Sequence, residues 1–181
     1  MPDNPEDTAK TTLNPVAAPV KGWRSMWWIA LALLLVLFDQ LTKQAIIDSF
    51  TEYQRQNVLP FFDLVRLHNT GAAFSFLAGE GGWQNQLFMA IAGAVSLGLV
   101  WWLAVLPRRG KVVLALGLAL ILGGALGNLI DRLLYGYVVD FLLFYWRDWS
   151  YPAFNIADSA ITCGAVLVLF DGLVLERRAG N

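Results

Sequence analysis

Residues 87–106 form an unbroken run without a charged side chain. A helix of this length rises about 30 Å at 1.5 Å per residue, which matches the hydrocarbon thickness of a bilayer. Hydrophobic residues make up 57% of the 181-residue chain and charged residues only 15%, against about 25% charged residues in soluble domains. The charges are too few to cover a water-facing surface, so we expect an integral membrane protein.

Three further apolar stretches are long enough to cross a membrane. Residues 1–22 are rich in Pro, Asp, Thr and Ala and have no apolar period, so we expect a disordered cytoplasmic tail. No small-residue cleavage site follows the first stretch, which is therefore expected to be retained as a helix rather than removed as a signal peptide. Residues 23–178 are expected to form a single four-helix membrane domain. Its predicted spans are about 27–47, 87–106, 112–130 and 155–175.

The positions of the basic residues predict the orientation of these spans. Lys and Arg side chains gather in cytoplasmic loops of membrane proteins. Here they lie before the first span, between the second and third, and after the fourth, as Lys10, Lys21, Arg24, Arg108, Arg109, Lys111, Arg177 and Arg178. Both termini are therefore expected to be cytoplasmic, and segments 48–86 and 131–154 are expected on the other side.

The two external segments carry signals for a small sheet at the membrane surface. Aromatic and β-branched residues within 57–69, followed by Thr70 and Gly71, predict one or two short strands and a turn. The second segment carries aromatic residues typical of a membrane interface, namely Tyr145, Trp146, Trp149 and Tyr151. We expect an all-α membrane protein with four transmembrane helices and a small extracytoplasmic β-rich segment.

Polar residues of three predicted spans converge near the outer membrane boundary, together with one acid of the second external segment. Ionisable groups at this depth are costly and face a bundle interior or a wet cavity. Pairs three or four residues apart also share a helical face. The converging residues are Asp39 and Lys43, Asn128 and Arg132, Asn155 and Asp158, and the external Asp140.

Simpler explanations apply to several of these polar and small residues. The four-residue spacing of Asp39 and Lys43 predicts an intrahelical ion pair, which would be a structural role. The spacing of Gly123 and Gly127 predicts close helix packing. Asp131 lies off the face of its neighbour Arg132, and we expect it to be solvated.

Two residues near the fourth span also receive structural explanations. Asp171 lies near the cytoplasmic end of this span and is expected to snorkel or to pair with Arg177 or Arg178. Cys163 lies roughly opposite Asp158 on the helix, and we interpret it as a small packing residue rather than a nucleophile.

Asp140 and Asp158 are harder to explain structurally, because both are carboxylates in apolar surroundings. Two acids that share one proton can activate water and polarise a peptide carbonyl without a metal or cofactor. His68 is the only histidine, which argues against a zinc site. The formal net charge of −1 gives no basic footprint for nucleic acid.

Other assignments remain open from the residues alone. Lys43 could pair with Ser75 or Ser159 as a Ser–Lys dyad, although no feature selects that pairing. Intramembrane carboxylates also occur in transporters and in proton or ion pathways. A membrane scaffold without catalytic activity is a third possibility.

Five ordered segments resemble the lipoprotein signal peptidase family, also called signal peptidase II. The resemblance extends from about residue 27 to residue 175. The segments are FDQLTK at 38–43, HNTGAAFS at 68–75, GGALGNLIDR at 123–132, VVDF at 138–141 and FNIADS at 154–159.

The resemblance implies a bacterial inner-membrane aspartic endopeptidase with its site near the periplasmic face. Its substrates would be diacylglyceryl-modified prolipoproteins, cut just before the lipidated Cys, and its partners would include membrane lipid and globomycin-type cyclic peptide inhibitors. Asp140 and Asp158 would form the catalytic dyad, without a metal, in a protein that we expect to be a monomer. The family motifs further imply substrate-binding or supporting roles for Asn69, Gly71, Asn128, Arg132 and Asn155, and structural roles for Asp39 and Lys43.

Overall fold

The computed structural model describes residues 23–71, 83–107 and 111–175. The predicted cytoplasmic tail, residues 1–22, lies outside this part of the chain, as do Arg177 and Arg178. Within these ranges, four helices are long and apolar enough to cross a membrane, which confirms the predicted fold class. They are α1 (Trp23–Ser49), α2 (Trp83–Val105), α3 (Val112–Tyr135) and α4 (Ile156–Phe170), the last continued by the π-helical turn η2 (Asp171–Leu175).

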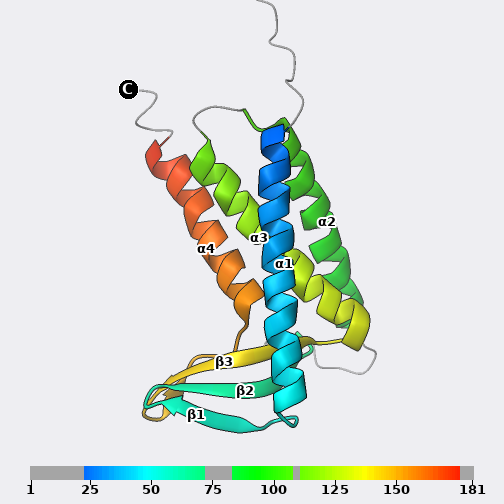
Figure 1. Cartoon of the computed structure of the whole chain (residues 1–181). Helices are drawn as coiled ribbons and strands as arrows, with labels where there is room; N and C mark the ends of the chain where they lie inside the picture. Colours follow the sequence, from blue (N-terminus) through cyan, green and yellow to red (C-terminus); the bar gives the residue numbers. More distant parts are fainter. Residues whose placement is uncertain (1–22, 72–82, 108–110, 176–181) are drawn as a thin grey trace, which may run out of the picture.

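A four-stranded antiparallel sheet lies at one end of the helix bundle (Figure 1). Its strands are β1 (Arg55–Leu59), β2 (Phe62–Asn69), β3 (Val138–Trp146) and β4 (Trp149–Ser150), in the order β1-β2-β3-β4. The first external segment supplies β1 and β2, as predicted. The second supplies β3 and β4, where the sequence indicated only interfacial aromatic residues.

The connection between α3 and β3 is short because α3 continues beyond its predicted end at residue 130. The helix ends only at Gly136, whose φ of 81° lies in the left-handed region and whose N–H donates to the Arg132 carbonyl. Glycine adopts this conformation without steric cost. β3 begins two residues later, so Asp140 lies close to the end of α3.

Helix α3 is the central and most buried span, and it packs against the other three helices. A Cβ atom added to Gly123 would lie 2.9 Å from the Ala32 carbonyl oxygen of α1. A Cβ atom on Gly124 would overlap the Ala157 carbonyl of α4. The glycines therefore allow the helix backbones to approach closely, which confirms the predicted packing role.

We predict that Gly124→Ala lowers the stability of the protein, because its methyl group must displace the α4 backbone. Overpacking of this kind costs about 1–3 kcal/mol. Gly98→Ala in α2 is the matched control, since nothing lies within 4 Å of its added Cβ. Thermal unfolding in detergent micelles checks this, and equal melting temperatures for the two variants would contradict it.

Candidate active site

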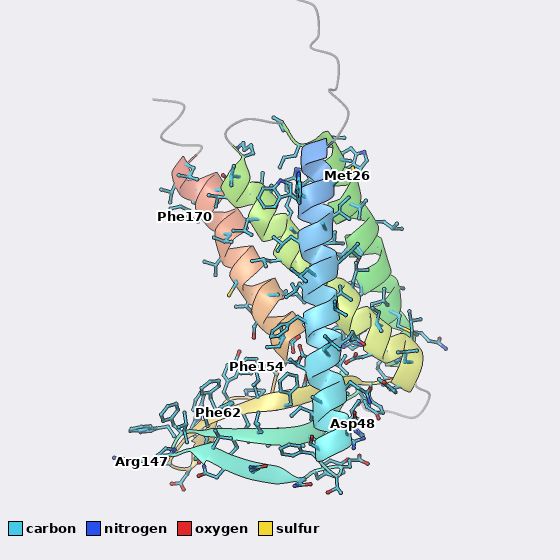
Figure 2. The ribbon with its side chains drawn as sticks, in the orientation of Figure 1. Met26, Asp48, Phe62, Arg147, Phe154 and Phe170 are labelled. Carbon is cyan, nitrogen blue, oxygen red and sulfur yellow. The ribbon has the colours of Figure 1, made fainter. Side chains whose placement is uncertain are left out.

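Asp140 and Asp158 meet where the sheet joins the helix bundle. Asp140 is the third residue of β3, and Asp158 lies in the first turn of α4. Asn155 contacts both carboxylates: its Nδ2 donates to Asp140 Oδ1 at 2.8 Å, and its backbone N–H donates to Asp158 Oδ2 at 3.3 Å. Figure 2 labels Phe154, the preceding residue, at this junction. The structure thus brings the two acids to one place.

The start of α4 holds Asp158 in position. Asn155 is the N-cap residue, and its Oδ1 accepts the backbone N–H of Asp158 at 2.9 Å. Asp158 in turn accepts the backbone N–H of Asn155, which completes a capping box. A carboxylate in the first turn of a helix also interacts favourably with the helix dipole. Local sequence near the N-terminus of α4 therefore orients one of the two acids.

Two further asparagine amides donate to the acids. Asn128 Nδ2 donates to Asp158 Oδ1 at 2.7 Å, and Asn69 Nδ2 donates to Asp140 Oδ2 at 2.8 Å. The Asn69 amide is oriented by Gly71, whose N–H donates to Asn69 Oδ1 at 2.8 Å. Each carboxylate oxygen therefore accepts one of these hydrogen bonds or one from Asn155.

A buried ammonium group lies behind the two acids. Lys43 Nζ is 2.8 Å from Asp39 Oδ2, 2.9 Å from Asp131 Oδ2 and 2.9 Å from Asn128 Oδ1. Because Asn128 turns its oxygen toward Lys43, it must turn its amide nitrogen toward the catalytic candidates. The ion pair of Lys43 thereby determines which atom Asn128 presents to the site.

The two acids paired with Lys43 also hold the backbone beside the candidate catalytic residues. Asp39 Oδ1 accepts the N–H of Ala157 at 2.9 Å, one residue before Asp158. Asp131 Oδ2 accepts the N–H of Val139 at 3.0 Å, one residue before Asp140. Helices α1 and α3 therefore fix the places where both acids enter the site.

The prediction that Asp131 is solvated is wrong, because this residue is 0% exposed. The continuation of α3 places Asp131 three residues after Asn128, on the face that meets α1. There it also accepts a hydrogen bond from Gln40 Nε2 at 2.8 Å. The three-residue spacing between Asn128 and Asp131 places both on one helical face and could have predicted this burial from the sequence. The prediction of a solvated side chain instead considered only its position beside Arg132.

Two other expectations also differ from the structure. Asp171 is buried rather than snorkelling, and it pairs with Lys111 at 3.2 Å, at the start of α3. Cys163 is exposed on the outside of the bundle and does not fill a packing position. The face of the fourth span that points toward lipid is as apolar as the face that packs against other helices. The sequence alone therefore could not distinguish an exposed position from a packing position for Cys163.

Arg132 and His68 flank the site. The Arg132 guanidinium interacts electrostatically with Asp158 and Asp140, and its Nη1 lies 3.3 Å from the Asn128 carbonyl oxygen. His68 directs Nδ1 to Glu52 at 2.9 Å and stacks on the Tyr137 ring at 3.9 Å. These contacts indicate a structural role for His68 within the sheet. Arg132, by contrast, places a positive charge next to the two acids.

The electrostatics favour a proton on Asp140. Burial, and then the charge of Asp158, raise the pKa of Asp140 from 3.8 to about 7. Hydrogen bonds from Asn69 and Asn155 and the charge of Lys43 act in the opposite direction. A carboxyl group that binds a proton near neutral pH beside a second acid can supply acid and base chemistry.

Comparisons with known proteins agree with one another. The family model described as "Signal peptidase (SPase) II" matches residues 31–174. The lipoprotein signal peptidase of Neisseria meningitidis serogroup C (strain 053442) is 53% identical over 159 residues, which cover 87% of this chain and 94% of that protein. That of Alteromonas mediterranea is 53% identical over 150 residues, or 83% of this chain and 80% of the relative.

A solved structure is similar along most of the chain. It is described as "Bacterial membrane enzyme structure by the in meso method at 1.9 A resolution", with a TM-score of 0.71 and 31% identity. The match covers 82% of this chain and 94% of that one. All the site residues described above lie within the range matched by the family model.

We predict that Lys43→Met strongly destabilises the protein. The change leaves Asp39 and Asp131 buried without their cation, and removing one partner of a buried ion pair costs about 3–5 kcal/mol. Gln44→Met, on the exposed face of the same helix, is the control. Thermal unfolding of both purified variants measures the difference. A Lys43→Met protein with the same melting temperature as the unaltered protein would refute the prediction.

We also predict that stability falls as pH rises from about 4 to about 7. In that window the folded state keeps a proton on Asp140 that the unfolded state has released, so folding is favoured at the acidic end. The contribution is at most about 4 kcal/mol. Asp140→Asn should remove most of this dependence, and Asp148→Asn, at an exposed site, should preserve it. Unfolding curves at pH 4.5 and pH 8 provide the test, and an unchanged dependence in Asp140→Asn would disprove it.

Proposed function

The chain belongs to the signal peptidase II family, whose members cleave lipoprotein signal peptides, and on that premise we propose that Asp140 and Asp158 are its catalytic acids. The observation that carries the proposal is the direct contact of Asn155 with both carboxylates. The matched relatives are peptidases, so the comparisons give no support to an ion pathway or a scaffold.

The proposed reaction uses one proton shared between the two acids. Asp140 holds it, in keeping with its raised pKa of about 7, and donates a hydrogen bond to the scissile carbonyl. The carboxylate of Asp158 takes a proton from the attacking water. As the tetrahedral intermediate collapses, the proton gained by Asp158 passes to the departing amine, which becomes the new N-terminus.

The surrounding polar residues orient the acids and bind the developing charge. Asn69, Asn128 and Asn155 each place a donor on a carboxylate oxygen, which restricts rotation of both side chains. Arg132 supplies a positive charge beside the pair. Such preorganised groups stabilise charge in a transition state without reorganising during the reaction.

The position of the site suits a lipid-anchored substrate. Asp158 lies in the first turn of α4, and β3, which follows α3, carries Asp140. The sheet lies at this end of the helices that can cross a membrane (Figure 1). A diacylglyceryl-modified Cys would leave its acyl chains in lipid and present its preceding peptide bond at this level. We therefore propose cleavage of diacylglyceryl-prolipoproteins just before the lipidated Cys, with membrane lipid in contact with the helices.

The proposed location is the bacterial inner membrane, with both termini cytoplasmic and the site near the periplasmic face. Lys111 lies at the end of the bundle opposite the sheet, while exposed Trp146 and Trp149 lie on the sheet. Basic residues on the inner side and aromatic residues at the interface support this orientation. We further propose that residues 23–178 act as one monomeric domain and that globomycin-type cyclic peptides compete for the site.

The decisive experiment incubates purified protein in lipid vesicles with a diacylglyceryl-modified precursor and follows release of the signal peptide. Asp140→Asn and Asp158→Asn should each lower kcat by at least about a hundredfold, because each removes an acid–base group. Asp148→Asn should cleave normally. Substantial turnover by either dyad variant, once shown to be folded, would remove the assignment while leaving the family membership intact.

A further inference from the structure

Phe88, in the second turn of α2, contacts two elements of the site. The Arg132 guanidinium of α3 lies over its ring, 5.3 Å from the ring centroid. On another side, its ring edge lies so close to Gly71 that a Cβ atom there would overlap it. One aromatic ring thus connects α2 with α3 and with the chain that follows β2.

The contact of Phe88 with Gly71 affects the orientation of the Asn69 side chain. Gly71 has a φ of 87°, which allows its N–H to reach Asn69 Oδ1. That bond directs Asn69 Nδ2 to Asp140. By packing against Gly71, the ring of Phe88 supports the turn that determines the orientation of the Asn69 amide.

The second contact of Phe88 is with the Arg132 guanidinium, which is itself a supporting group of the site. Nη1 of the guanidinium makes a long bond to the Asn128 carbonyl, and among the described residues its buried Nε has no hydrogen-bond partner. An aromatic face attracts a cation through its ring quadrupole. The ring of Phe88 therefore helps to restrain where the Arg132 charge lies relative to the acids.

We propose that Phe88 is a positioning residue for the cleavage reaction, acting through Gly71 and Arg132 on the environment of the two acids. The inference rests on the proposed dyad. No motif segment contains Phe88, and its place in an apolar span makes it look like an ordinary lipid-facing or packing residue. Its two contacts distinguish it from those roles.

The test compares Phe88→Leu with Phe88→Tyr and with Trp101→Leu, an exposed aromatic residue of the same helix. Phe88→Leu should lower kcat for the diacylglyceryl-modified precursor by about tenfold or more, because misplacement of supporting groups is costly in catalysis. KM should change by less than about threefold, because the proposal has the ring act on the acids through Arg132 and Gly71 rather than bind the substrate. Phe88→Tyr, which keeps the ring, and Trp101→Leu should both stay near the unaltered rate.

The pH profile separates positioning from packing. Arg132 and the Asn69 bond both favour the ionised form of Asp140, so their displacement should move the limb of the kcat–pH profile that reports Asp140 to higher pH. A loss of kcat without that movement, or an unchanged kcat, would overturn the inference. If Phe88→Leu does not fold, Phe88→Met, whose longer and more flexible side chain adapts to the space left by the ring, is assayed in the same way.

Asp140→Asn in the same assay distinguishes the two proposals. If Asp140→Asn cleaves normally, the dyad assignment fails, and the inference about Phe88 fails with it. If Asp140→Asn is inactive while Phe88→Leu retains both its rate and its pH profile, only the inference about Phe88 is overturned.

Discussion

The ammonium group of Lys43 is the contact on which the rest of the site depends. It lies buried between Asp39 and Asp131 and also meets the oxygen of Asn128. An unpaired charge at this depth in a membrane protein would be expensive, so the paired arrangement is strongly preferred. Through these three partners, one side chain of α1 acts on α3, on β3 and on the start of α4.

This arrangement explains how a site can be rigid although its two acids come from different kinds of element. Asp39 holds the backbone of α4 next to Asp158, and Asp131 holds the backbone of β3 next to Asp140. The glycines of α3 make the arrangement possible, because they let the helix backbones approach within the reach of short acidic side chains. Close packing and polar contacts therefore depend on each other in this bundle.

The sheet forms part of the candidate active site as well as one end of the molecule. β3 carries Asp140, and the neighbouring β2 ends at Asn69, opposite Val138 in register. Burial at this junction raises the pKa of Asp140 to about 7, into the range where acid–base catalysis at neutral pH is efficient. The boundary between sheet and bundle thus supplies both the position and the protonation chemistry of the site.

The sequence by itself determined the four spans and the polar residues that share a helical face, because span length and spacing along one helix are local properties. It also singled out the two candidate acids, because each is a carboxylate in apolar surroundings. Only the tertiary structure decided that Asp131 is buried against Lys43, that Asp171 pairs with Lys111, that Cys163 is exposed and that Phe88 meets Arg132. The physical reason is that lipid-facing and core-facing positions of a membrane helix are both apolar. Hydrophobic periodicity therefore leaves helix rotation undetermined, and contacts between helices depend on that rotation.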